Sequence, residues 1–362
     1  LQIAYRNILK IKDMCEDYSL LKPLYIPQLP WKESKIKYIQ NCWIERIPYL
    51  KTFVESDYIG DQVLACMIVE DLEDGPQQLW NQKTWDEVNA CLEMTWISSN
   101  VNKAHWSAYY LNLQRIIEEC WKAGTLVGPG RGSGVGFILL YLLNITQINP
   151  LQETTKTFRW RFLNPDRVSV LDVDVDIEGG RRAEVLNHLR KVYGDNRVSN
   201  VATFRQEKSK SAILTACRGL GIDVDIASYL ASLIPSDRGI LRTLSQCMYG
   251  DIENDWKPIK QFVYEMTENY PEVWEVAQKI EGLICGYGIH AGGVIFVDEP
   301  FTNSTGLMRA PDGTIITAFD LHACEDVSLI KYDLLSVEAL DKIHNCLDLL
   351  VDYGYVKKRD TL

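Results

Sequence analysis

Residues 168–178 read VSVLDVDVDIE, and this stretch decides how the rest of the chain is interpreted. Asp172, Asp174 and Asp176 alternate with apolar residues, and a period of two is typical of a β-strand with one buried face. The other face then carries three carboxylates about 6.5–7 Å apart along the backbone. Because like charges repel, a divalent cation such as Mg²⁺, which prefers hard oxygen ligands, is a natural counter-ion. The alternative is an edge strand with a solvated acidic face.

A glycine-rich loop precedes this strand. Residues 125–127 are expected to form a short strand, residues 128–134 (GPGRGSG) a loop, and residues 135–143 an apolar helix. A loop that leads into the start of a helix presents backbone N–H groups and a helix dipole, which both favour an anion such as phosphate. The loop lacks the Lys-Ser/Thr ending of a Walker motif, and a dinucleotide-binding pattern is also not convincing.

Basic residues lie on both sides of the aspartate strand. Residues 159–167 contain three arginines, including Arg161, which could pair with the carboxylates or neutralise a triphosphate. Residues 182–193 are expected to form a helix, and residues 198–204 a strand. A mostly helical region then extends to residue 283. Its first helix is basic and includes Lys210, which indicates either a solvated face or phosphate contacts.

The chain then returns to strand-like sequence. His290 is expected in a glycine-rich turn that leads into a strand at residues 294–297. Residues 314–319 and 329–335 predict two more strands, and the second carries Lys331 and Asp333 on one face. Ser336 is expected to cap the last helix.

The N-terminal part has no residues for which we predict chemistry. Three prolines within residues 23–30 predict an extended linker rather than a packed element. Residues 35–70 and 80–97 have mixed helical patterns, and residues 103–122 have the spacing of a helix with one buried face. Four tryptophans are expected in the core or an interface rather than stacked on bases: Trp43, Trp80, Trp85 and Trp96.

Composition limits the class of protein. The chain has 362 residues, enough for two or three domains, and 46% of them are hydrophobic. The formal net charge of −11 argues against a simple basic nucleic-acid-binding protein, but it is compatible with an enzyme that has a local positive groove. Ten cysteines without a CxxC pair indicate reduced, mostly buried thiols. No signal peptide or membrane-spanning run is recognisable, and a first residue other than Met suggests a piece of a longer polypeptide.

Taken together, these stretches resemble the C-family replicative DNA polymerases, the group of the bacterial DNA polymerase III alpha subunit. The similarity is a series of motifs in the family's order. They are residues 127–134 (VGPGRGSG), 161–169 (RFLNPDRVS), 171–177 (LDVDVDI), 203–210 with Arg218, 233–235 (LIP), 290–295 (HAGGVI) and 329–334 (LIKYDL). We therefore expect a divergent or phage member of this family.

The resemblance implies an α+β fold, namely a DNA polymerase beta-like nucleotidyltransferase palm with a mixed β-sheet, helices and an inserted helical thumb. It divides the chain into the linker or tail of a missing N-terminal domain (1–41), a first palm part (42–203), the thumb (204–284), a second palm part (285–345) and the start of a connection to missing fingers (346–362). The implied activity is DNA-directed DNA polymerisation, the transfer of dNTPs onto a primer 3′-hydroxyl in DNA replication.

The same resemblance assigns site residues and partners. Asp172, Asp174 and Asp333 are the implied catalytic residues and the ligands of two Mg²⁺ ions, while Asp176 is left open as a ligand. Six residues are implied to bind the incoming nucleotide: Gly132, Ser133, Arg161, Lys331, Lys210 and His290. The implied partners are primer-template DNA, dNTPs and, through parts outside this chain, a sliding clamp and other replisome subunits, with no membrane. The implied location is the cytoplasm of a bacterium or a phage-infected bacterium.

A few positions depart from the family pattern. Leu171 and Ile177 replace a proline and a phenylalanine, Cys285 stands where the family has an arginine, and Ser336 replaces a glycine. None of these changes removes an implied metal ligand. Two alternatives remain: a template-independent nucleotidyltransferase that shares the palm, and a catalytically retired polymerase core that acts as a replication scaffold. The intact aspartates argue against the second alternative.

Overall fold

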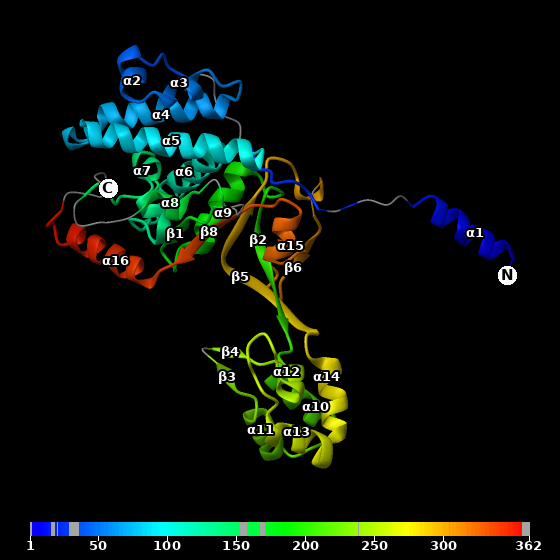
Figure 1. Ribbon diagram of the computed structural model, residues 1–362. Coiled ribbons are helices and arrows are strands. Elements are labelled where there is room, and N and C mark those ends of the chain that lie inside the picture. The colour runs from blue at the N-terminus through cyan, green and yellow to red at the C-terminus, as the bar shows by residue number, and fades with distance from the viewer. Residues whose placement is uncertain are drawn as a thin grey trace. The chain divides into compact units, whose positions relative to one another are not determined.

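The computed structural model describes residues 2–15, 19, 21–28, 36–152, 158–164, 166, 171–237, 239–303 and 305–356. The chain forms two compact units, Leu1–Val201 with His290–Leu362, and Ala202–Ile289. It enters the second unit along strand β2 (Val198–Gln206) and returns along β5 (Ile284–Phe296) (Figure 1). The second unit overlaps residues 204–284, the segment predicted to be a thumb.

The first unit is organised around a six-stranded sheet with the order β1-β8-β5-β2-β7-β6. Strand β1 (Asp174–Ile177) pairs in parallel with β8 (Lys331–Ser336), whereas β5 pairs with β8 in the antiparallel direction. Strand β7 (Ile315–Thr317) is parallel to β2 and antiparallel to β6 (Leu307–Arg309). The sheet is therefore mixed, and together with its helices it gives the α+β class predicted from the sequence.

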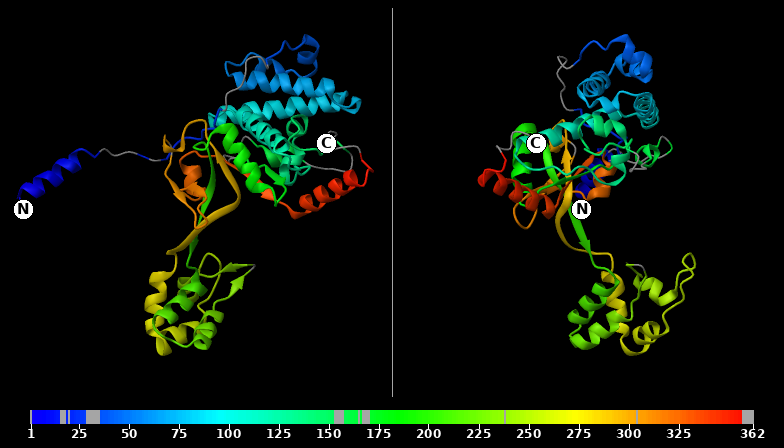
Figure 2. Two further views of the ribbon diagram at one scale, coloured as in Figure 1. Left: turned by 180° about the vertical axis from the view of Figure 1, so that it is seen from behind. Right: turned by 90° about the vertical axis from the view of Figure 1, so that its left-hand side faces the viewer.

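Helices cover this sheet. In Figures 1 and 2, α4 and α5 lie beyond α6 as seen from the strands, and α9 lies next to α6. The α-helices of this unit are α1 (Gln2–Asp13), α2 (Asn41–Arg46), α3 (Tyr49–Val54), α4 (Ile59–Asp74), α5 (Gln82–Asn102), α6 (Trp106–Lys122), α7 (Ile138–Leu142), α8 (Arg159–Phe162), α9 (Arg182–Tyr193), α15 (Leu321–Asp326) and α16 (Glu338–Asp352). Short 3₁₀ helices are η2 (Gln77–Leu79), η3 (Gly132–Gly136) and η5 (Phe301–Asn303). None of the helices in the described part of the chain is both long and apolar enough to cross a bilayer.

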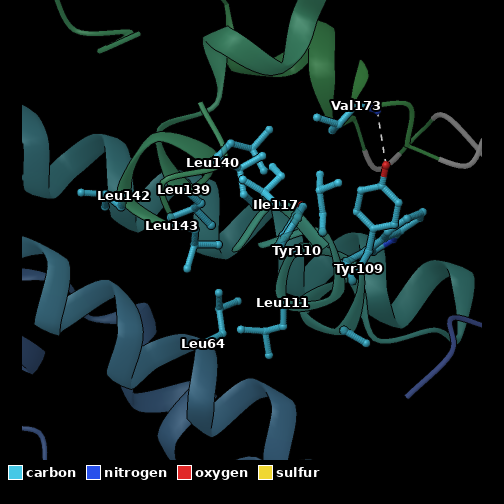
Figure 3. Packing of buried hydrophobic residues seen from close by; sticks show 14 of the residues in the cluster. Leu64, Tyr109, Tyr110, Leu111, Ile117, Leu139, Leu140, Leu142, Leu143 and Val173 are labelled. Atoms are coloured by element: carbon cyan, nitrogen blue, oxygen red, sulfur yellow. Dashed lines mark hydrogen bonds between the residues drawn. The ribbon is translucent and has the colours of Figure 1, made fainter. Parts of the chain in front are cut away.

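Helix α6 lies at the centre of the core and supports the aspartate strand. Leu111 points toward Leu64 of α4, while Tyr109 points toward the chain at Val173 (Figure 3). The Tyr109 hydroxyl accepts a hydrogen bond from the Val173 N–H at 3.3 Å, and its ring stacks on Tyr332 of β8 with centroids 5.3 Å apart. Burial raises the pKa of Tyr109 well above its usual range, so the hydroxyl stays neutral. The apolar faces of β1 and β8 are thus fixed on one buried helix.

The second unit has a core of its own. Its elements are α10 (Ser209–Gly219), α11 (Val224–Ser232), the β3 (Ser236–Asp237) and β4 (Ile240–Leu241) hairpin, α12 (Leu244–Tyr249), α13 (Lys260–Tyr264), a π-helical turn η4 (Glu265–Asn269) and α14 (Pro271–Ile280). Ile213, Leu230 and Phe262 are fully buried in its apolar cluster. Proline at the first position of α14 suits a helix start, where its missing N–H needs no partner.

Several sequence predictions are confirmed by the structure. Leu171, Val173, Val175 and Ile177 are buried and alternate with more exposed aspartates, although regular strand begins only at Asp174 and residues 167–170 lie outside the described part. The helix at residues 182–193 has the predicted bounds. The predicted helix at residues 135–143 is shorter, because the 3₁₀ turn η3 occupies its start.

Three local predictions are wrong. His290 lies within β5 rather than in a turn, since the neighbouring glycines keep extended backbone and serve close packing instead. Proline-rich residues 22–28 are extended as predicted, but two of them are packed: Ile26 is 3% exposed, and the carbonyl of the buried Pro27 accepts a hydrogen bond from Asn112 Nδ2 at 2.6 Å. Ser336 ends β8 opposite Ile177 and therefore does not cap α16, which is preceded by Val337.

Candidate active site

The parallel pairing of β1 and β8 brings together three of the predicted catalytic residues. Asp174 lies directly opposite Asp333 in the ladder, and Asp172 precedes Asp174 by two residues on the same face. Carboxylate oxygens of Asp172, Asp174 and Asp333 all lie within 4.8 Å of one another. Hydrogen bonds between the strands thus bring Asp333 to two aspartates that are already close in sequence.

The cluster runs from solvent into the protein. The exposed fraction of the side chain falls from 64% at Asp172 to 31% at Asp174 and 7% at Asp333. Burial and the neighbouring negative charge of Asp172 raise the pKa of Asp174. Burial also raises the pKa of Asp333, although the hydrogen bond from Lys331 opposes that shift. Burial therefore disfavours the ionised form of both side chains.

Two basic side chains border the carboxylates. Lys331 Nζ lies 2.5 Å from Asp333 Oδ2 and 3.9 Å from Asp172 Oδ1. Arg131, from the glycine-rich loop, lies on the other side, with Nε 3.5 Å from Asp174 Oδ2 and Nη1 3.1 Å from Asp176 Oδ1. Asp176 is therefore directed to Arg131 and is not part of the three-carboxylate cluster.

The cluster fits a metal ion. Asp333 Oδ1 is buried and has no hydrogen-bond partner among the described residues. A buried acceptor without a donor costs free energy, and an ionised oxygen costs more. Three carboxylates that converge around such an oxygen form the hard-oxygen donor set that Mg²⁺ or Ca²⁺ prefers.

The glycine-rich loop lies against the aspartate strand. The Gly128 N–H donates to the Asp176 carbonyl at 2.8 Å, and a Cβ at Gly128 would come within 2.7 Å of Asp176 Cβ. Farther along, Gly132 has a positive φ of 66° and open space around its Cα, while Ser133 is half-buried in η3. Close packing thus holds the loop at β1, and its exposed tip can approach a ligand.

The other predicted nucleotide-binding residues are placed differently. Arg161 lies on α8, which packs beside η3, and its side chain is exposed and makes no ion pair among the described residues. His290 is half-buried on β5, where its Nδ1 accepts a hydrogen bond from the Gly293 N–H at 2.8 Å. Lys210 belongs to α10 of the second unit. The structure therefore brings Lys331 to the carboxylates directly and leaves the roles of these three residues as predictions.

Sequence reasoning missed two arginines that contact this region. Arg131 stands within the quoted glycine-rich motif, so its position beside the aspartate strand was a usable signal. Arg182 opens α9 immediately after the aspartate strand, and its guanidinium donates to the carbonyl of Leu334, the residue after Asp333. That acceptor lies about 150 positions away in the chain, and no local pattern indicates such a contact.

Comparison with known proteins agrees with this geometry. A probable DNA polymerase of Bacillus subtilis, YorL, and a DNA-directed DNA polymerase of Bacillus phage SPbeta are each 38% identical over 99% of the chain. The DNA polymerase III subunit alpha of Thermus aquaticus is 34% identical over 67% of the chain. The chain spans 28%, 28% and 19% of the length of these three relatives.

A family match covers most of the chain, including both carboxylate strands. Residues 65–336 match the bacterial DNA polymerase III alpha NTPase domain. This range contains the glycine-rich loop, the aspartate strand and Asp333. The mixed sheet and helices also fit a nucleotidyltransferase-like palm. The chain therefore belongs to the family of the bacterial DNA polymerase III alpha NTPase domain.

Proposed function

We propose that this chain is the palm and thumb portion of a DNA-directed DNA polymerase that adds dNTPs to a primer 3′-hydroxyl. The observation that carries the proposal is the three-carboxylate cluster of Asp174 and Asp333, on two adjacent parallel strands, with Asp172 just before the first strand. Lys331 and Arg131 border these carboxylates, but a buried oxygen of Asp333 has no hydrogen-bond partner among the described residues, which favours a metal site over a purely structural ion-pair network.

The three aspartates are proposed to hold two Mg²⁺ ions. When bound, such ions lower the pKa of an attacking hydroxyl and neutralise charge on the triphosphate. The chain's own residues would set their position: β1 and β8 fix the carboxylates, and α6 supports both strands from the opposite face. Lys331 holds one oxygen of Asp333, which keeps that side chain in one orientation.

The nucleotide is proposed to lie between the cluster and the glycine-rich loop. Gly132 is exposed at the loop tip next to the half-buried Ser133, and Arg131 brings a guanidinium to the edge of the cluster. A guanidinium is suited to phosphate oxygens because it can donate two parallel hydrogen bonds. Arg161 and His290 are proposed as further contacts to the nucleotide, from α8 and β5.

The domain organisation is also a proposal. We assign residues 42–203 and 285–345 to a nucleotidyltransferase palm of the DNA polymerase beta-like type, and residues 204–284 to a thumb. The thumb assignment is supported by the separate helical core of the second unit, whose first helix carries Lys210. Residues 1–41 and 346–362 would connect to neighbouring domains. Primer-template DNA, a sliding clamp and other replisome subunits are the proposed partners, in the cytoplasm of a bacterium or a phage-infected bacterium.

Primer extension by the complete protein tests this function. With Mg²⁺, a primed template and dNTPs, the wild-type protein is expected to extend the primer according to the template sequence, and Asp174→Asn to abolish extension. Asp195→Asn, at an exposed position after α9, is the matched control and should extend like wild type. Extension of single strands without a template would instead indicate a template-independent nucleotidyltransferase, and no extension by the wild type would contradict both enzyme proposals.

A further inference from the structure

Strands β5 and β8 meet beside Asp333, where their regular pairing ends. The register pairs Gly293 with Asp333, and the adjacent Gly292 has its Cβ position on the side of Asp333 and Leu335. The carbonyls of Gly292 and Leu334 both accept a hydrogen bond from one side chain of α9. Because buried backbone carbonyls are costly without a donor, that side chain stabilises this point of the sheet.

Arg182 supplies both donors. Its Nε donates to the Leu334 carbonyl at 3.2 Å, and its Nη2 donates to the Gly292 carbonyl at 3.2 Å. The donors of a guanidinium have a fixed planar spacing, so one side chain sets the separation of two strands. Burial lowers the pKa of Arg182 while the charge of Asp333 opposes that shift, which places the guanidinium in the field of this carboxylate.

The Cα of Gly292 lies beside the Asp333 oxygen that has no hydrogen-bond partner among the described residues. A Cβ built on Gly292 would lie 3.4 Å from Asp333 Oδ1 and 2.4 Å from Leu335 Cδ2. The backbone at Gly292 therefore defines the space available to both side chains. A small movement of β5 at this point would change the orientation open to the Asp333 carboxylate.

The backbone of Arg182 is connected to strand β1 by a short turn. It follows the Gly179-Gly180 turn at the end of β1, and the N–H groups of these glycines donate to the two carboxylate oxygens of Asp341 at 3.0 Å each. Arg182 thus starts from β1 and its side chain reaches β8 and β5. These are the strands that carry or adjoin all three aspartates of the cluster.

We propose that Arg182 is a positioning residue that fixes the separation of β5 and β8 and so orients the Asp333 carboxylate toward Asp172 and Asp174 for metal binding. The inference rests on the proposed function, because it assigns the aspartates to a metal site. Charge alone does not perform this role: an ammonium group at position 182 keeps the charge but lacks the two-pronged donor geometry.

Metal binding and activity of Arg182 variants test the inference. Mn²⁺ serves as the probe and is titrated by electron paramagnetic resonance into the complete protein without DNA or nucleotide, so that this readout is independent of catalysis. Arg182→Lys is the main variant because it keeps the charge and most of the buried stem, and Arg182→Gln removes the charge as well. Arg181→Lys is the matched control, since Arg181 donates to the Gly124 carbonyl and lies near Glu178 instead.

The expected result is that Arg182→Lys and Arg182→Gln each weaken Mn²⁺ binding about 10-fold or more, as loss of a partner that orients a ligand does. In primer extension, kcat should fall while KM for dNTP changes less, and Arg181→Lys should behave like wild type in both assays. Mn²⁺ binding by Arg182→Lys equal to wild type, with only a lower apo-protein Tm, would overturn the inference, as would an equal loss in Arg181→Lys. Failure of the wild type to extend primers would contradict the proposed function, yet the Mn²⁺ titration would still decide the role of Arg182.

Discussion

The carboxylates at the two ends of strand β1 are in opposite situations. Glu178, just after the strand, is 2% exposed, and its Oε1 accepts the Leu126 N–H at 2.5 Å and hydrogen-bonds to the buried His344. Asp172 and Asp174, at the start, are partly exposed and lie next to the buried Asp333, whose Oδ1 has no hydrogen-bond partner among the described residues. The protein itself satisfies the first arrangement, whereas the second leaves one buried oxygen of Asp333 without a donor among the described residues.

The difference separates a structural carboxylate from a candidate ligand on one strand. Glu178 joins β1 to α16, which carries His344, and to the chain at Leu126 ahead of the glycine-rich loop. Its charge is used to hold elements together. The three-carboxylate cluster contributes repulsion instead, since burial and like charge raise the pKa of Asp174. Mutation of Glu178 should therefore mainly lower stability, whereas mutation of an aspartate in the cluster should mainly lower activity.

The largest expected effect distinguishes Asp333 from Asp176. Asp333→Asn should lower kcat on the order of 10⁴-fold, the scale at which loss of an essential catalytic group acts. The kcat of Asp176→Asn should stay within about 10-fold of wild type, because Asp176 pairs with Arg131 outside the cluster. Its loss would affect the metal site only indirectly. Primer-extension rates measure both. Equal losses would show that Asp176 belongs to the metal site and would enlarge the cluster to four carboxylates.

Stability should change in the opposite sense at the two ends. Glu178→Ala should lower the free energy of unfolding by about 3 kcal/mol, because it leaves the buried Leu126 N–H and His344 without their acceptor. Asp174→Ala should leave the metal-free protein unchanged or slightly more stable, since it relieves repulsion and breaks only an exposed pair with Arg131. Urea denaturation of the metal-free protein measures both. A comparable loss in Asp174→Ala would mean that the cluster is structural.

Asp71 on α4 extends the comparison to a half-buried carboxylate outside the cluster. Burial, with the nearby charges of Glu70 and Asp74, raises the pKa of Asp71 from 3.8 to about 7. The pKa of Asp71 is higher in the folded than in the unfolded state, so ionisation of this side chain opposes folding. The free energy of unfolding therefore decreases as the pH rises from about 4 to about 7 and Asp71 loses its proton. Asp71→Asn should therefore stabilise the protein by about 1 kcal/mol at about pH 8, after solvent screening, and by little near pH 4.

Urea denaturation at the two pH values measures this gain, with the exposed Asp195→Asn as the control. A gain of the same size at both pH values would point to a cause other than ionisation. A loss at high pH would show that the Asp71 charge has a stabilising partner. Either result would weaken the rule that carboxylates without a partner oppose folding in this protein.

The local chemistry of the site could be predicted from sequence because it depends on alternation. The pattern at residues 171–177 places the aspartates on one face of a strand whatever that strand pairs with. The register of Asp174 with Asp333 could not be derived in this way, since it is set by long-range hydrogen bonds between β1 and β8. Only the resemblance to a family placed Asp333 in the site before the structure did.

Residues that act through backbone contacts were harder to predict. Arg182 looks like an ordinary residue at the start of a helix, and its role depends on carbonyls of two other strands. The glycines around His290 are typical of a turn, but in β5 they allow other side chains to approach, as Leu335 does at Gly292. In both cases the sequence shows the residue type, while the function of that residue depends on packing between elements distant in the chain.

The smallest expected effect concerns the support of the cluster by α6. Tyr109→Phe keeps the ring that stacks on Tyr332 but removes the acceptor of the Val173 N–H, which lies between Asp172 and Asp174. We expect a loss of about 1 kcal/mol in stability and a severalfold loss of kcat, on the order of a displaced outer-shell group. Tyr110→Phe is the matched control, because the Tyr110 hydroxyl lies 3.4 Å from Thr95 Oγ1, within the helical layer. If both variants lose similar stability but only Tyr109→Phe loses activity, α6 positions the aspartate strand. If kcat is unchanged in Tyr109→Phe, the ladder with β8 alone is sufficient to hold Asp172 and Asp174 in place.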